Sequence, residues 1–242
     1  MLDALLKNEF FWVAILALYA FGVILFTRYI YDYLVRKRIK RSVAVYYNRK
    51  IIHIFAGGVV VLAVPFAFDS PWYPILAGIL LAVLMYILHL SGRILYWFQT
   101  KEDFNDVSFC FMWAIAIFIL WTIFNDPWIA VIPPAFIAFG DGITGIVRNF
   151  AFNQRRKHPI GNIYMAGLCI PIGYFLASFS SVNGLAIWGV LAAIVASVFE
   201  RYEFGPIDDN ILITISATAI LIHSNTSSEL NCCPLLFILI LN

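Results

Sequence analysis

Long apolar runs follow one another along almost the whole sequence, and they limit its fold more than any other feature. The runs lie at about residues 10–31, 51–68, 74–90, 107–124, 127–140, 160–179, 183–199 and 207–223. Because a helix needs roughly 20 residues to cross a bilayer, these runs predict an all-α, polytopic transmembrane helical bundle with about eight spans. We expect the fifth span to be broken near Pro133 and Pro134.

The overall composition excludes several classes of protein. Of the 242 residues, 62% are hydrophobic and 12% are charged, whereas soluble domains are usually about 45–50% apolar and 25% charged. A soluble globular domain, a disordered chain and a nucleic-acid-binding domain are therefore excluded, and the net charge of +2 is too small to indicate a polyanionic partner. We expect one integral-membrane domain over residues 1–223, in contact with a lipid bilayer, and an interfacial or poorly ordered tail over 224–242. The sequence does not indicate an oligomeric state.

Positive charges are concentrated between the first two runs, where residues 36–50 hold seven lysines and arginines and no acid. By the positive-inside rule, this segment is cytoplasmic. Alternation from it predicts outside loops without lysine or arginine and an N-terminus outside. The remaining loops, expected inside, contain Arg93, Lys101, Arg148 and Arg201.

Three groups of polar residues lie at the predicted cytoplasmic ends of spans. An ionisable group at the edge of a span is a candidate functional site, because a charge at the bilayer centre costs on the order of 3 kcal/mol. In the first group, Arg49, Lys50 and His53 share one helical face, and Gly57 continues it. Alone, this group also fits interfacial cations beside a core histidine.

The second group is Gly140-Asp141-Gly142 with Gly145. It fits the dinucleotide fingerprint G-x-G-x-x-G, but neither the preceding strand nor the acid about 20 residues later is present. A carboxylate between glycines at a broken helix end lets a cation or phosphate approach closely. Three basic residues follow: Arg155, Arg156 and Lys157. A carboxylate for a divalent metal beside cations for phosphates is the minimum set for phosphoryl transfer.

The third group leads into the last run and contains Glu200, Asp208, Asp209 and Asn210. No Asp or Glu lies between Asp141 and Glu200, so the acids that gather here suggest a metal-binding edge. Asp208 and Asp209 also suit the N-terminus of a helix that begins near Pro206. Metal ligation and helix capping both stay open for these two aspartates.

In this order and spacing, the motifs resemble those of the CTP-dependent polyprenol kinase family. The motifs are R-K-x-x-H before a glycine pair, G-D-G at the end of a span, a lysine followed by Gly161-Asn162, and E…D-D-N before the last span. The family includes dolichol, phytol and farnesol kinases and is related to phosphatidate cytidylyltransferases and CDP-archaeol synthases. The resemblance covers about residues 45–222. Many members have K-x-x-E-G, whereas this chain has Ile160 before Gly161, a form more similar to prokaryotic or archaeal members.

The resemblance implies a kinase that transfers the γ-phosphate of CTP to the hydroxyl of a membrane polyprenol, a dolichol or a related isoprenoid alcohol. It implies that Asp141, Asp208 and Asp209 bind Mg²⁺ and, with Lys157, form the catalytic set. The residues implied to bind the nucleotide and its phosphates are Arg49, Lys50, His53, Gly140, Gly142, Gly145, Arg155, Arg156, Gly161, Asn162 and Asn210. The expected location is the cell membrane of a prokaryote or archaeon, or the endoplasmic reticulum of a eukaryote, with the active site facing the cytoplasm.

Two other functions stay open at this level. A CDP-lipid synthase would use the same nucleotide and metal, but the lysine-aspartate and aspartate-arginine pairs of its signature are absent from this sequence. A membrane transporter would carry ionisable residues deep in several spans, whereas here they gather on one side.

Overall fold

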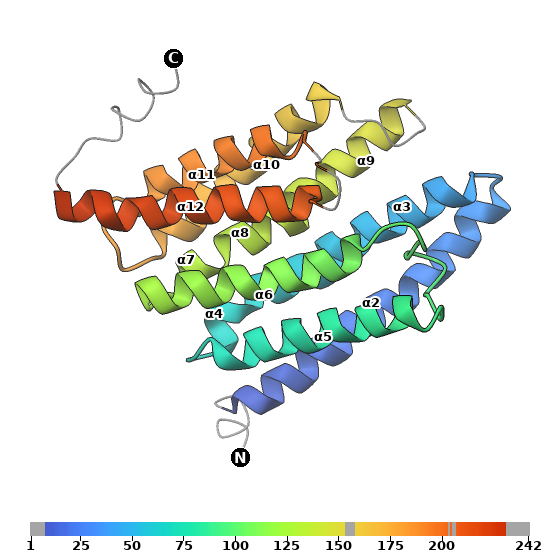
Figure 1. The fold of residues 1–242 in the computed structure, drawn as a ribbon, viewed down its shortest axis with the longest axis horizontal. Helices are drawn as coiled ribbons and strands as arrows, with labels where there is room; N and C mark the ends of the chain where they lie inside the picture. The colour runs from blue at the N-terminus through green and yellow to red at the C-terminus, as the bar shows by residue number, and fades with distance from the viewer. Residues whose placement is uncertain (1–7, 153–157, 203, 205–206, 231–242) are drawn as a thin grey trace.

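The computed structural model describes residues 8–152, 158–202, 204 and 207–230, and within these ranges the protein is helical (Figure 1). The only β-type pairing within them is a single bridge between Phe204 and Ile207. The predicted all-α class is therefore confirmed. The helices are α2 (Glu9–Arg36), α3 (Arg41–Ile52), η1 (His53–Gly58), α4 (Val59–Ala67), α5 (Trp72–Leu90), α6 (Asn105–Phe124), α7 (Pro127–Ala130), α8 (Ile132–Ala135), η2 (Phe136–Gly140), α9 (Asp141–Phe152), α10 (Pro159–Ser178), α11 (Leu185–Phe199) and α12 (Asp209–Leu230).

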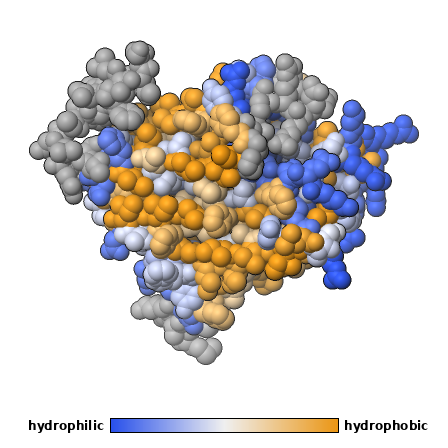
Figure 2. Space-filling view, in the orientation of Figure 1, coloured by the Kyte–Doolittle hydropathy of each residue, from blue (hydrophilic) through white to orange (hydrophobic). Residues whose placement is uncertain are grey.

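Among the described residues, six helical segments are long and apolar enough to cross a membrane. Two of them combine several helices: α3, η1 and α4 form Arg41–Ala67, and α7 to α9 form Pro127–Ala151. Figure 2 shows rows of hydrophobic residues along one flank and hydrophilic residues gathered at one end. These features indicate a membrane-embedded protein. The last two predicted runs also lie in helices, the shorter apolar helix α11 and helix α12.

The segment Pro127–Ala151 forms the centre of the bundle. In its most apolar 18-residue window, 83% of the residues are buried, against 6 to 44% in the other five segments. The expected break near Pro133 and Pro134 is confirmed, since α7 ends before Val131 and the π-helical turn η2 follows α8. A proline inside a helix removes a backbone donor, which favours such an interruption. Asp141 opens α9 directly after this irregular stretch.

One end of the bundle, called the basic end here, contains residues 36–41, the connection 91–104 and the N-termini of α10 and α12. Arg49 of α3 is ion-paired with Asp103 of the connection at 3.0 Å. The Asn210 side chain of α12 donates to the Asn105 carbonyl of α6 at 3.1 Å. These contacts bring segments from distant parts of the sequence to the same end of the molecule.

Two predicted boundaries differ from the structure. Helix α3 begins at Arg41, so Arg49 and Lys50 lie inside a helix rather than at its start. Both side chains are buried and ion-paired, which allows the helix to continue through them. Helix α12 continues to Leu230, past the expected start of the tail at residue 224, and the Ser224 hydroxyl is satisfied by the Leu221 carbonyl at 2.6 Å. Residues 231–242 of the expected tail lie outside the described residues.

Candidate active site

A buried ion pair joins the first two polar groups that the sequence indicated. The Lys50 ammonium on α3 donates to both carboxylate oxygens of Asp141 on α9, at 2.6 and 2.5 Å. His53 Nδ1 lies 3.2 Å from Asp141 Oδ2, and the imidazole stacks on the Phe109 ring with centroids 4.0 Å apart. The Asp141 side chain is almost fully enclosed, with 1% of its residue surface exposed. A charge so deeply buried needs a close partner, and Lys50 provides it.

Asp141 also belongs to a group of three buried carboxylates, called the carboxylate centre here. One oxygen atom from each of Asp141, Glu200 and Asp209 lies within 4.8 Å of the other two. Glu200 follows the C-terminus of α11, and Asp209 is the first residue of α12. Carboxylate oxygens are the ligands that Mg²⁺ prefers, so this donor set fits the ion that the resemblance implies.

Arg148 of α9 is ion-paired with Glu200 of the carboxylate centre. Its two terminal nitrogens donate to the two Glu200 oxygens, each at 2.6 Å, which is the bidentate geometry that suits a guanidinium. The Asn162 side chain accepts from Arg148 at 3.2 Å and donates to Glu200 at 3.3 Å. Asn162 also donates to the Ser197 carbonyl. The predicted phosphate residue Asn162 therefore lies in the network that orients Glu200.

Asp208 and Asp209 are neighbours in sequence but have different surroundings. Asp208 Oδ1 accepts the backbone N–H of Ile211 at 3.1 Å, as a helix-capping aspartate does, and Asp208 Oδ2 accepts the Ser108 hydroxyl. Burial, reinforced by the nearby Asp209 charge, raises the pKa of Asp208 from its ordinary value of 3.8 to about 6. The structure thus brings Asp209 to Asp141 and Glu200, whereas the Asp208 oxygens are engaged at the start of α12.

The last predicted site residue of this stretch, Asn210, bridges two helices. Its side-chain amide donates to Ser108 Oγ at 3.1 Å as well as to the Asn105 carbonyl. It therefore ties the start of α12 to the start of α6, close to Asp208.

The glycines assigned to phosphate binding face other protein side chains. A Cβ atom on Gly140 would lie 2.5 Å from Cys169 Sγ, and one on Gly142 would lie 2.5 Å from Ile54 Cγ1. On Gly145 it would meet the Lys50 stem at 2.5 Å, and on Gly161 it would meet the Arg148 guanidinium. Gly145 and Gly161 thus permit the close approach of Lys50 and Arg148, whereas Gly140 and Gly142 permit close packing against Cys169 and Ile54.

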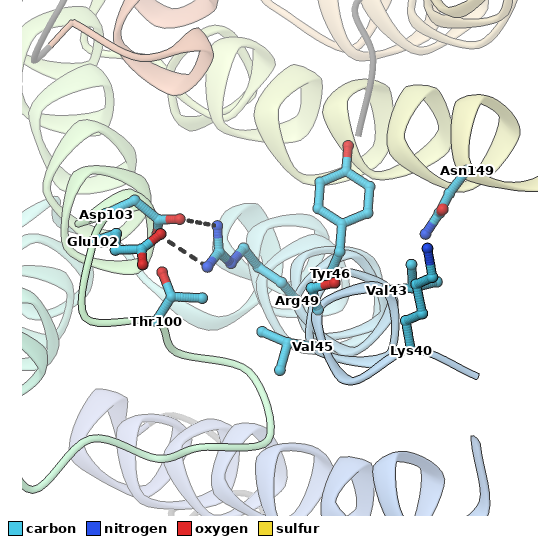
Figure 3. A pocket seen from close by; sticks show the side chains of 10 residues that line it. Lys40, Val43, Val45, Tyr46, Arg49, Thr100, Glu102, Asp103 and Asn149 are labelled. Atoms are coloured by element: carbon cyan, nitrogen blue, oxygen red, sulfur yellow. Dashed lines mark hydrogen bonds and ion pairs between the residues drawn. The ribbon is translucent and has the colours of Figure 1, made fainter. Parts of the chain in front are cut away.

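Arg49 points away from the carboxylate centre. It pairs with Asp103, donates to the Phe98 carbonyl at 3.3 Å and lines an open cavity of about 300 Å³ between α3, α9 and the connection 91–104 (Figure 3). Three other predicted residues, Arg155, Arg156 and Lys157, lie outside the described residues.

Two residues of this network were not among the expected site residues. The sequence pattern predicts Arg148 in an inside loop, but it lies inside α9 and is 3% exposed. Arg148 follows Asp141 by seven residues, which is about two helical turns. This spacing in the sequence could have indicated that the two residues lie on the same side of one helix. Glu200 was noted among the acids before the last run but not assigned as a ligand.

No family model, curated protein or solved structure matches this chain.

Proposed function

We propose that this protein is a Mg²⁺-dependent phosphotransferase that moves the γ-phosphoryl group of CTP to the hydroxyl of an isoprenoid lipid alcohol. The observation that carries the proposal is the carboxylate centre beside Lys50 at the basic end of a membrane-embedded bundle. The motif resemblance adds the nucleotide and the class of acceptor. Phosphoryl transfer is consistent with such a site, because its catalysis is almost entirely positioning and charge stabilisation.

Asp141, Glu200 and Asp209 would hold the metal ion. Lys50 and Arg148 are ion-paired with two of these three carboxylates, so the carboxylates exceed these two cations by one charge. Mg²⁺ is usually bound by one or two carboxylates together with substrate phosphates. A bound Mg²⁺ would neutralise negative charge on the transferred phosphoryl group.

The protein's own cations and carboxylates have separate parts in the proposed reaction. Lys50 binds phosphate oxygens, since its ammonium carries three donors and lies at the edge of the carboxylate centre. Arg148 and Asn162 keep Glu200 in place. Asp209 accepts the proton of the attacking hydroxyl, because the Asp208 oxygens are engaged by Ser108 and the α12 backbone. The lipid oxygen bonds to the γ-phosphorus, the bond from that phosphorus to the bridging oxygen breaks, and CDP leaves.

The proposal includes an orientation in the membrane. We take α11 and α12 as the seventh and eighth spans and place the basic end in the cytoplasm, following the positive charges at residues 36–41. CTP is cytosolic and a lipid hydroxyl lies at the headgroup level. Both substrates then reach the carboxylate centre from the same end.

Two other functions share parts of this site. A CDP-lipid synthase would use the same carboxylates and cations to attack the α-phosphorus of CTP. A transporter would use Lys50 and Asp141 as ionisable groups within candidate membrane spans. The gathering of three carboxylates beside two cations at one end favours a phosphate-transferring enzyme over a transporter. The motif resemblance, together with the absence of the synthase signature pairs from the sequence, favours the kinase over the synthase.

A substrate panel tests the proposal. Purified protein in detergent with Mg²⁺ is incubated with CTP, ATP, GTP or UTP and with geranylgeraniol, phytol, dolichol or diacylglycerol. We expect phosphorylated prenol from CTP, and none when Mg²⁺ is chelated. Absence of phosphorylated lipid in every combination would overturn the proposed function.

A further inference from the structure

The cavity between α3, α9 and the connection 91–104 is separate from the carboxylate centre but adjacent to it. Its volume of about 300 Å³ is at the lower end of the range for small-molecule sites. Tyr46 and Arg49 of α3 line it, with Thr100 and Asp103 of the connection and Asn149 of α9 (Figure 3). Tyr46 links the two regions, since the Lys50 ammonium lies 5.2 Å from the centroid of its ring.

Asn149 is the most informative residue of this cavity. It is 1% exposed, and neither its side-chain nitrogen nor its oxygen has a hydrogen-bond partner among the described residues. Figure 3 shows its side chain extending from α9 toward α3. The Thr100 hydroxyl, on the other side of the cavity, likewise lacks a partner within the described part of the chain. Unpaired buried polar groups are costly and uncommon in native proteins, so a donor and an acceptor kept together in a cavity wall indicate a ligand.

Asn149 also lies on the helical face that leads to the carboxylate centre. Asp141, Gly145 and Asn149 are spaced four residues apart on α9, so they follow one another along one side of the helix. The Lys50 stem covers Gly145 between the other two. A ligand that binds Asn149 at one end can therefore reach Lys50 and Asp141 at the other, two helical turns away.

The chemistry of the cavity favours the base and ribose of a nucleotide over its phosphates. The lining charges balance, with Lys40 and Arg49 against Glu102 and Asp103, and Arg49 is already ion-paired with Asp103. The cavity therefore has no net positive charge to hold a triphosphate, whereas its carboxylates can accept hydrogen bonds from ribose hydroxyls. The Tyr46 ring offers a stacking surface for a base. A carboxamide presents a donor beside an acceptor, which pairs with the amino group and adjacent ring nitrogen of cytosine, as Asn pairs with adenine in DNA recognition.

We propose that this cavity is the base-and-ribose subsite for a pyrimidine nucleoside triphosphate, and that Asn149 binds the edge of the base. The inference rests on the proposed function only in assigning the triphosphate to Lys50 and the carboxylate centre. The volume of about 300 Å³ is large enough for a pyrimidine base with its ribose.

Equilibrium binding to the purified full chain in detergent tests the subsite without any turnover. The probes are CTP, UTP, ATP and tripolyphosphate, which has the phosphates but no base. Asn149→Leu removes both hydrogen-bonding atoms at similar volume, and since these atoms lack protein partners it should not lower the melting temperature. We expect CTP affinity to fall at least about tenfold through the loss of two hydrogen bonds, with tripolyphosphate affinity unchanged. Phe150→Leu, at a residue of the same helix that is 83% exposed, is the matched control and should bind CTP as wild type does.

Several outcomes would overturn the subsite. The first is equal CTP affinity in wild type and Asn149→Leu. The second is a loss of tripolyphosphate affinity in Asn149→Leu as large as its loss of CTP affinity. The third is a wild-type protein that binds each nucleotide no more tightly than it binds tripolyphosphate. Failure of the proposed function looks different. In that case Asn149→Leu would still weaken CTP binding, but no lipid alcohol would be phosphorylated by the wild type.

Discussion

Asp141 is the residue on which most of the proposed site depends, because it pairs with Lys50 and His53 and belongs to the carboxylate centre. Asp141→Asn should lower turnover by about a hundredfold or more, the usual effect of removing a group that stabilises transition-state charge. It should also cost about 3 kcal/mol of stability, since Lys50 is left as a buried, unpaired cation. Activity and melting temperature of the purified variant measure the two effects.

The double variant Lys50→Met/Asp141→Leu separates these effects. Removing both charges should restore much of the lost melting temperature, because apolar side chains replace a buried ion pair at little net cost. Activity should stay absent. A double variant as unstable as Asp141→Asn would mean that the ion pair is not the source of the instability.

Asp208 and Asp209 should respond differently to the same substitution. Asp209→Asn removes a charge from the carboxylate centre, so activity should fall by orders of magnitude. Because the substitution also reduces the repulsion among the three carboxylates, the melting temperature should stay at or above that of wild type. Asp208→Asn should keep most of the activity, because Asn caps a helix as well as Asp does. Steady-state assays of both variants at saturating CTP check this. A severe loss of activity in Asp208→Asn but not in Asp209→Asn would contradict this assignment and would make Asp208 the metal ligand.

Asp208 also predicts a pH dependence of stability. Its folded pKa of about 6 lies above the ordinary value of 3.8, so burying the ionised form costs stability above pH 6, and the cost disappears as the pH falls below about 4. The uncharged Asp208→Asn side chain avoids that cost. Melting curves in chelator should therefore show this variant more stable than wild type at pH 8, by on the order of 2 kcal/mol, and equal to it near pH 4. A gap that is the same at both pH values would contradict the pKa assignment.

At the scale of elements, the contact between α3 and α9 decides whether Lys50 reaches Asp141. Gly145→Ala would place a Cβ atom 2.5 Å from Lys50 Cε, so the flexible lysine must shift and its ammonium must leave its present position. We expect a turnover loss of about tenfold or more with a small change in melting temperature. Gly167→Ala is the matched control, because nothing lies within 4 Å of the added atom. It should stabilise α10 by about 0.5–1 kcal/mol and leave activity unchanged. Equal activity of both variants would show that this close approach is not required.

The sequence predicted the elements better than the contacts between them. Apolar runs located the helices, because bilayer thickness fixes the length of a span. They did not reveal that residues 41–50 continue the second helix, since that stretch is polar and is stabilised by ion pairs with Asp103 and Asp141. The apolar runs likewise place Arg148 in a loop, because its bidentate partner Glu200 lies 52 residues away in the sequence. Partnerships of this kind depend on tertiary packing and leave no local periodic signal.

At the scale of the whole molecule, the central segment Pro127–Ala151 explains how a charged site can exist in a largely apolar chain. Its apolar part is enclosed by the surrounding helices, and its C-terminal part carries Asp141 and Arg148 toward the basic end. The prediction that polar groups gather at one end followed from where they fall relative to the apolar runs. The sequence did not show which acids lie close together. Asp208 and Asp209 are adjacent, and only the direction of each side chain at the start of α12 distinguishes them.

The central claim, phosphoryl transfer at the carboxylate centre, is tested most directly by following label from CTP into lipid. Purified protein is given a prenol and CTP labelled at either the α- or the γ-phosphate, with Asp209→Asn and Asp208→Asn assayed in parallel. We expect label in the lipid from γ-labelled CTP only, retained in Asp208→Asn and lost in Asp209→Asn. Label that enters lipid from the α-phosphate, or transfer from the γ-phosphate that is undiminished in Asp209→Asn, would contradict it.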